Sequence, residues 1–194
     1  MKTVYLMRAG ESLFNMLGKV QGWCDSPLTE RGIEQALATK KYFADHNINL
    51  EVAYCSTAER ASDTLELVTD LPYKRLKGLK EFSAGRFEAE SHDLLPPPPF
   101  GDFFVSYGGD SAANFKERVA NTIASLVQAE TANTILIVSH GGVCRNFMRT
   151  WSHTSNVNYG GQLSNGGVLK FEYKNQQFML REVINHESTR LQEG

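Results

Sequence analysis

Three basic side chains, Arg8, Arg60 and His140, stand where the sequence leads us to expect a strand to end or a helix to begin. Guanidinium groups stay charged at physiological pH and donate paired hydrogen bonds to phosphoryl oxygens. An imidazole and the backbone amides of Gly141 and Gly142 can fill the remaining acceptor directions. Two simpler interpretations stay open, a helix ion pair for Arg60 and a hydrogen-bonded core position for His140. Together the residues predict a phosphate site, although they name no reaction.

Two apolar strands must position these side chains. Residues 4–7 form an unbroken apolar run and residues 134–138 a β-branched run, as expected for strands buried on both faces of a parallel sheet. Arg8 follows the first run, whereas His140 follows the second and precedes a helix predicted over residues 143–150. Ligands of open α/β sheets bind at the carboxyl ends of strands, and a helix N-terminus favours an anion. We therefore expect both residues at one edge of one sheet.

Strand and helix patterns alternate along the rest of the chain. Helices are predicted over residues 30–45 with Thr29 as N-cap, from Ser56 with capping-box spacing to Glu59, and over residues 112–129. The inward face of the first is expected to hold Ile33, Ala36, Leu37, Phe43 and Ala44. Further strands are predicted at 51–55, 73–76, 168–173 and 178–183, the last two as an antiparallel edge hairpin. This pattern predicts an α/β fold, a mostly parallel central sheet with helices on both faces.

The composition is typical of a soluble globular protein, with 194 residues, 41% hydrophobic and 22% charged residues, and a net charge of −2. No basic excess suggests nucleic acid, and no apolar run approaches the roughly 20 residues that span a bilayer. Cys24, Cys55 and Cys144 lack metal-ligand or disulfide spacing and are interpreted as small buried hydrophobic residues. We expect a cytoplasmic protein without nucleic-acid or membrane partners, either a monomer or a homodimer.

One biased segment, residues 82–110, interrupts the alternation and is called the lid segment below. It contains four consecutive prolines at 96–99 and the aromatic residues Phe87, Phe100, Phe103, Phe104 and Tyr107. We expect it to be a lid inserted in a single domain that spans residues 1–194. The aromatic side chains either line an apolar pocket for the substrate or pack a small core of the lid itself.

The motifs around these positions resemble those of the histidine phosphatase superfamily, which includes the cofactor-dependent phosphoglycerate mutases. The matching blocks occur in order: LMRAGES at 6–12 with Asn15, QG at 21–22, DSPLT at 25–29, STAERA at 56–61, LKEF at 79–82, VSHGG at 138–142 and SNG at 164–166. Several ordered blocks are far more specific than any one of them. The resemblance implies a phosphoglycerate mutase-like fold and phosphomonoester chemistry that uses neither a metal nor a cofactor.

The resemblance also implies a role for each matching position. Arg8, Arg60 and His140 would bind the phosphoryl oxygens, and Glu81 would act as general acid and then as general base. Phosphate binding would extend to Ser12, Asn15, Gln21, Gly22 and Gly141. The family's Arg-His-Gly triplet reads Arg8-Ala9-Gly10 here, and a methyl group can neither attack phosphorus nor carry a phosphoryl group. We therefore expect this chain to be inactive or nearly so.

Two explanations account for Ala9, a deliberate replacement of the nucleophile or a natural phospholigand-binding protein without catalysis. We favour replacement because the acid, both arginines and the second histidine remain in register. A weaker idea makes His140 itself the nucleophile.

Between Phe82 and Phe115 the only Lys or Arg is Arg86, so we expect too few cations for a mutase, which must hold a further carboxylate and phosphate. The sequence thus favours a phosphatase acting on a small phosphorylated metabolite, with a mutase as the alternative; the prolines keep that alternative open.

Overall fold

A computed structural model describes residues 1–186 and contains one six-stranded sheet with the order β3-β2-β4-β1-β5-β6. Four strands are parallel: β1 (Lys2–Arg8), β2 (Val52–Ser56), β3 (Tyr73–Leu76) and β4 (Thr134–Ser139). The antiparallel strands β5 (Val168–Lys174) and β6 (Gln177–Ile184) form the edge hairpin. This arrangement confirms the predicted α/β fold class.

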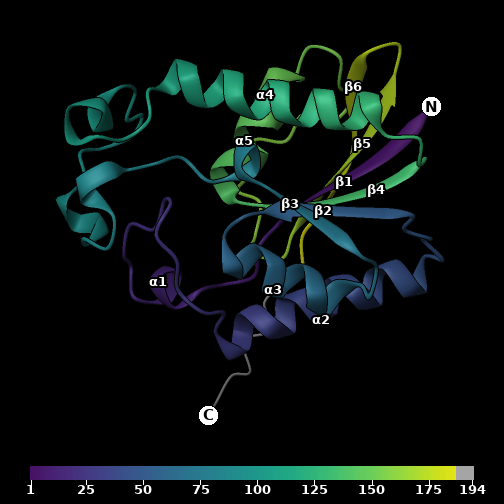
Figure 1. Cartoon of the computed structure of the whole chain (residues 1–194), viewed down its shortest axis with the longest axis horizontal. Helices are drawn as coiled ribbons and strands as arrows, with labels where there is room; N and C mark the ends of the chain where they lie inside the picture. Colours follow the sequence, from purple (N-terminus) through teal and green to yellow (C-terminus); the bar gives the residue numbers. More distant parts are fainter. Residues whose placement is uncertain (187–194) are drawn as a thin grey trace.

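Helices cover both faces of the sheet (Figure 1). α2 (Glu30–Asp45) and α3 (Glu59–Val68) pack on one face, and α4 (Ala112–Ala129) and α5 (Gly141–Thr150) pack on the other. Alternate side chains of β1 divide between the two cores, since Leu6 packs with the α4 and α5 side and Met7 with the α2 and α3 side. Within residues 1–186, no helix combines the length and apolarity needed to cross a membrane.

The face that α2 buries differs from the prediction. Thr29 is the N-cap as expected, and its side chain accepts a hydrogen bond from Gly32 N. Ile33, Leu37 and Ala44, however, are exposed, and the buried positions are Gly32, Ala36, Thr39 and Phe43. A Cβ at position 32 would lie 2.1 Å from the Glu11 carbonyl oxygen, so the backbone after β1 packs directly on this glycine. That close approach turns the small residues of α2 inward.

The predicted capping box of α3 is wrong, because Ser56 belongs to a strand and the helix begins only at Glu59. The N-cap is Ala58, which provides no side-chain hydrogen bond, and β2 continues through Ser56. The Ser56 hydroxyl accepts a hydrogen bond from Ala58 N and pairs with His140 Nε2.

Among the cysteines, Cys55 and Cys144 are buried as expected, whereas Cys24 is half-buried.

The lid segment lies beyond the carboxyl edge of the parallel strands (Figure 1). It contains three short 3-10 helices, Gly85–Phe87, His92–Leu94 and Phe103–Tyr107. Backbone hydrogen bonds from Val20 to Glu90, Ala89 to Val20 and His92 to Gly18 attach it to the N-terminal loop. That loop also contains a short helix that the sequence analysis missed, α1 (Leu13–Met16).

Candidate active site

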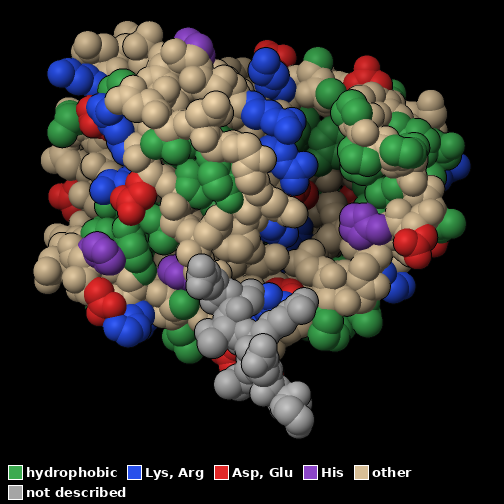
Figure 2. Space-filling view, turned by 180° about the vertical axis from the view of Figure 1, so that it is seen from behind, with side chains coloured by type: hydrophobic (Ala, Val, Ile, Leu, Met, Phe, Trp, Pro, Cys, Tyr) green, Lys and Arg blue, Asp and Glu red, His purple; other side chains and the backbone are tan. Residues whose placement is uncertain are grey.

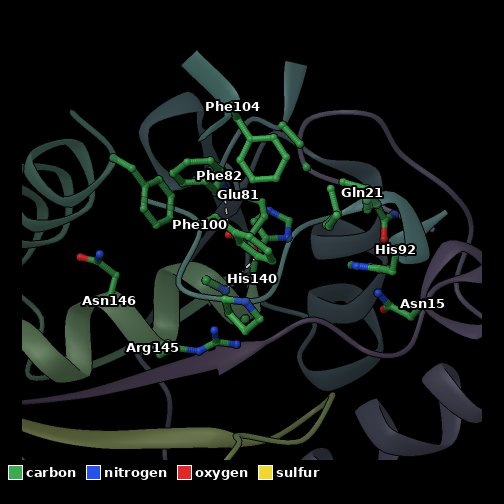
Figure 3. A pocket seen from close by; sticks show the side chains of 18 of the residues that line it. Asn15, Gln21, Glu81, Phe82, His92, Phe100, Phe104, His140, Arg145 and Asn146 are labelled. Atoms are coloured by element: carbon green, nitrogen blue, oxygen red, sulfur yellow. Dashed lines mark hydrogen bonds between the residues drawn. The ribbon is translucent and has the colours of Figure 1, made fainter. Parts of the chain in front are cut away.

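A cavity of about 740 Å³ opens at the carboxyl edge of the sheet, beneath the lid segment (Figure 3). Five side chains from four separate segments line the part of it next to the strand ends, which is called the narrow end below: Arg8, Ala9, Arg60, Glu81 and His140. The structure thus brings together residues that are up to 132 positions apart in the sequence. The volume lies in the range typical of small-molecule sites.

Ala9 forms part of the floor of this narrow end, directly after β1. Its side chain is 4% exposed. Its backbone N–H donates to the Ser139 carbonyl at 2.9 Å, and its carbonyl accepts from Gly166 N at 3.3 Å. The backbone is therefore held on both sides, so a side chain at position 9 has a defined direction into the cavity.

Arg60 is buried and held by the loop of residues 22–25. One guanidinium nitrogen, Nη1, donates to the Cys24 carbonyl at 3.0 Å and pairs with Asp25 Oδ1 at 2.8 Å. The other, Nη2, donates to the Gly22 carbonyl at 2.9 Å. The ion pair considered from the sequence exists, but its partner lies in this loop rather than on the helix. It fixes the guanidinium while the side chain still lines the cavity.

Arg8 extends from the end of β1 against the first turn of α5. Its Nη1 donates to the Leu163 carbonyl at 2.6 Å. A Cβ at Gly141 would lie 3.1 Å from Arg8 Nε, so the helix start and the guanidinium are in close approach. Burial lowers the pKa of Arg8, and nearby Glu81 opposes that shift. The side chain therefore supplies positive charge in a largely desolvated position.

His140 is the N-cap residue of α5, and its side chain is only 4% exposed. Its Nε2 lies 2.8 Å from the Ser56 hydroxyl, so the core hydrogen bond that the sequence left open also exists. Burial, followed by the positive charges of Arg60 and Lys80, holds the pKa of His140 well below its ordinary value. The imidazole is consequently neutral at pH 7.

Glu81 places its carboxylate on the N-terminus of α5. Oε2 accepts a hydrogen bond from Gly142 N at 2.8 Å, and Oε1 accepts one from Phe82 N at 2.9 Å. A Cβ at position 142 would lie 2.2 Å from Glu81 Oε1, so any larger residue there would force the Glu81 carboxylate to move. The backbone carbonyl of Glu81 accepts hydrogen bonds from Trp23 Nε1 at 2.9 Å and from Arg118 Nη2 at 3.1 Å. Sequence reasoning missed both donors.

The expected phosphate-binding residues divide into two groups. Asn15, Gln21, Gly22 and Gly141 line the cavity. Ser12 does not lie among the lining residues; it is fully buried, caps α1, and donates from its hydroxyl to Gln21 Oε1 at 2.6 Å. Gln21 in turn donates to the Ser26 hydroxyl at 3.1 Å. These side chains hold the loop in shape, and a direct contact of Ser12 with phosphate stays a prediction.

Glu88 of the lid segment is a further residue that the sequence analysis missed. Its Oε1 accepts from Trp23 N at 2.8 Å and Ala84 N at 3.1 Å, and its Oε2 accepts from Cys24 N at 2.7 Å. The same loop uses its carbonyl groups to hold Arg60. One carboxylate therefore connects the lid segment to a cavity arginine. No local pattern signals such a contact, because the partners are more than 60 residues apart.

Aromatic side chains of the lid segment take both of the roles considered from the sequence. Phe82, Phe100 and Phe104 gather along one side of the cavity (Figure 3). Phe104 also belongs to a small buried cluster with Val20 and Ala84, against which Phe87 and Phe103 pack. The lid segment thus has a core of its own and presents one apolar wall to the cavity.

The expected shortage of cations is wrong. The prediction counted only the lid segment, whereas the cavity is also lined by Lys19 from the N-terminal loop and by Arg145 and Arg149 from α5. The part of the cavity lined by these three cations is called the wide end below. Figure 2 shows a row of Lys and Arg side chains that leads into a hollow on this face of the molecule. Among the described lining residues, Glu81 is the one carboxylate. The cavity therefore attracts anions along its whole length.

The chain belongs to the histidine phosphatase superfamily (branch 1), whose family model matches residues 4–186. It is similar to adenosylcobalamin/alpha-ribazole phosphatase of Escherichia coli, with 31% identity over 152 residues that cover 72% of this chain and 74% of that protein. It is also similar to 2,3-bisphosphoglycerate-dependent phosphoglycerate mutase 2 of Bacteroides thetaiotaomicron, with 27% identity over 80% of this chain and 79% of that protein.

A similar solved structure is phosphoserine phosphatase from Entamoeba histolytica in complex with 3-phosphoglyceric acid. It has a TM-score of 0.77 and 27% identity, and the match covers 96% of this chain and 98% of that chain. The relatives of this chain thus include both phosphatases and phosphoglycerate mutases, which are enzymes acting on small phosphorylated metabolites.

Proposed function

We propose that this fold is a phosphomonoester hydrolase that works through a phosphohistidine at position 9, and that Ala9 replaces the nucleophilic histidine. The observation that carries the proposal is the position of Ala9 on the cavity floor, where Arg8, Arg60, His140 and the Glu81 carboxylate line the same narrow end. Candidate phosphate-binding residues that surround a methyl group support replacement of the nucleophile over gradual loss of the site. The chain as written binds its ligand and does not turn it over.

The reaction with a histidine at position 9 has two steps. The imidazole nitrogen attacks phosphorus, the bond to the ester oxygen breaks, and Glu81 donates its proton to that leaving oxygen. Water then attacks the phosphohistidine, Glu81 takes a proton from the water, and the P–N bond breaks to release phosphate. Arg8 and Arg60 offset the charge on the phosphoryl oxygens in both steps, with the α5 N-terminus and His140 beside them.

Phosphoglycerate mutase activity is the second candidate, and the cations at the wide end favour it. In a mutase reaction, the phosphohistidine would transfer its phosphoryl group to a second hydroxyl of the substrate instead of to water. The relative with 31% identity and the similar solved structure described above are phosphatases, which supports hydrolysis as the main reaction. The free cysteines support action in the reducing cytoplasm.

The test compares the chain with its Ala9→His variant on 4-nitrophenyl phosphate and on 3-phosphoglycerate, with a chelator present. We expect turnover by the variant alone, with a rate ratio of roughly 10⁵ or more, since loss of a nucleophile removes most of the catalysis. Released inorganic phosphate indicates hydrolysis, whereas 2-phosphoglycerate indicates the mutase. Phosphate binding without turnover by either protein would contradict the hydrolase and leave a binding protein, and turnover by the parent chain would contradict position 9 as the nucleophile.

A further inference from the structure

The cavity contains more positive charge than one phosphoryl group requires. Its described lining residues include five permanent cations, Arg8, Lys19, Arg60, Arg145 and Arg149, against the single carboxylate of Glu81. Arg8 and Arg60 lie at the narrow end, where the proposed reaction places the phosphoryl group. The other three belong to the wide end, so their charge has to meet another part of the ligand.

Two of these three cations share one helix face and have no side-chain partner among residues 1–186. Arg145 and Arg149 lie one turn apart on α5, and both are exposed. Within the described residues neither guanidinium makes a hydrogen bond or an ion pair, whereas Lys19 donates to the Ala89 carbonyl at 3.1 Å. Two neighbouring guanidiniums that line a cavity, and have no carboxylate partner among the described residues, can bind an anionic group of a ligand.

The distance between the two ends of the site is short. Arg8, Gly141 and Arg145 also line one small cavity of about 20 Å³, so the two arginines lie near each other beside the α5 N-terminus. Burial is the main cause that lowers the pKa of Arg8, and the charge of Arg145 lowers it further, as expected for neighbouring guanidiniums. In Figure 3, Arg145 lies across the cavity from the apolar wall of Phe82, Phe100 and Phe104. A ligand that reaches both ends therefore needs only a short carbon chain.

We propose that Arg145 and Arg149 form a second anion subsite, which selects phosphomonoesters with a carboxylate a few atoms from the phosphate. The planar, forked guanidinium matches a carboxylate in two parallel hydrogen bonds. The subsite belongs to α5 rather than to the lid segment, whose own arginine, Arg86, does not line the cavity. This inference rests on the proposed function only in placing the phosphate at the narrow end.

The test uses the chain with Ala9, which holds ligands without turning them over. Calorimetric titration compares 3-phosphoglycerate with glycerol 3-phosphate, which carries a hydroxymethyl group in place of the carboxylate. We expect the carboxylate to improve affinity by about tenfold or more, the equivalent of one charge-assisted hydrogen bond. The Arg145→Gln/Arg149→Gln double variant should bind both esters with affinities within about twofold of each other. In the matched control, Arg86→Gln, the preference should stay unchanged.

Each outcome has a separate meaning. Equal affinities of the parent chain for the two esters, or a preference that survives in the double variant, would overturn the subsite while leaving the phosphate site intact. A preference lost equally in Arg86→Gln would show a general effect of charge and would also overturn it. Failure of inorganic phosphate and both esters to bind the parent chain would instead contradict the proposed function. Circular dichroism of each variant confirms folding.

Discussion

The narrow and wide ends of the cavity are built on different principles. At the narrow end, Arg60 makes hydrogen bonds to two carbonyls and one carboxylate, and Glu81 accepts from two backbone amides. At the wide end, Arg145 and Arg149 are exposed on a helix and have no such support in the described part of the chain. The narrow end is thus preorganised for one chemical group, whereas the wide end can adjust to different ligands.

This difference follows from the elements that supply each end. Arg8 and His140 lie at the ends of β1 and β4, adjacent strands whose register pairs Arg8 with Ser139. Gly141 and Gly142 allow the α5 N-terminus to approach Arg8 and Glu81. The wide end instead combines a helix surface with a lid segment that is attached to residues 18–20 by backbone hydrogen bonds. We infer that reaction type depends on the first set of contacts and substrate choice on the second.

The largest expected effect belongs to the narrow end. In the Ala9→His background, Glu81→Gln removes the proton donor, so the rate constant kcat for an alkyl phosphate should fall roughly 10²- to 10⁴-fold. The fall should be smaller for 4-nitrophenyl phosphate, because its leaving oxygen needs little protonation. Steady-state kinetics on the two esters measures this ratio. Equal losses on both would contradict a general-acid role for Glu81.

Arg8→Gln should weaken phosphate binding by about tenfold to a hundredfold, since one charged hydrogen-bond donor is lost. Inorganic phosphate is titrated into the parent chain and into the variant. Arg86→Gln, which removes the same charge from the lid segment outside the cavity, is the control and should bind as the parent does. If the two variants behave alike, the ligand is held by general attraction rather than by the narrow end.

The pH dependence of stability tests the buried histidine. Burial and neighbouring cations lower the pKa of His140. Below about pH 6.5 this imidazole therefore binds a proton in the unfolded chain but stays neutral in the folded chain. Stability present above that pH should therefore fall with decreasing pH, by up to about 1.4 kcal/mol per pH unit from this residue. Urea unfolding from pH 7.5 to pH 5 should show a shallower slope for His140→Gln. His186, whose pKa burial also lowers, accounts for part of the remaining slope.

The smallest effect concerns the contact between Glu88 of the lid segment and the loop that holds Arg60. Glu88→Gln should weaken phosphate binding by about threefold to tenfold, because its carboxylate holds the loop that positions Arg60. Glu90→Gln, at an exposed position of the same segment, is the matched control. A drop in melting temperature with unchanged phosphate affinity would reduce Glu88 to a purely structural residue.

Residues whose placement depends on local patterns could be predicted. Arg8 and His140 follow apolar runs that are typical of buried strands, and Thr29 caps α2 as its spacing indicates. Glu81 lies outside any regular pattern, so only its resemblance to a family motif singled it out.

Long-range contacts explain what could not be predicted. Ser56 is not a capping residue because it belongs to β2, where its hydroxyl pairs with His140, 84 positions away. The inward face of α2 depends on Gly32, which approaches the backbone of Glu11. The sequence did not indicate the subsite arginines, because the prediction counted cations only within the lid segment. In the structure, side chains of α5 and of the lid segment line the same cavity.

Trapping the intermediate tests the central claim most directly. The Ala9→His variant and the parent chain are mixed with 4-nitrophenyl phosphate, quenched in alkali, which preserves phosphohistidine, and digested for mass spectrometry. The account predicts a phosphoryl group on the peptide that contains position 9 of the variant, and none on the parent chain. A phosphoryl group on His140 in either protein would contradict it.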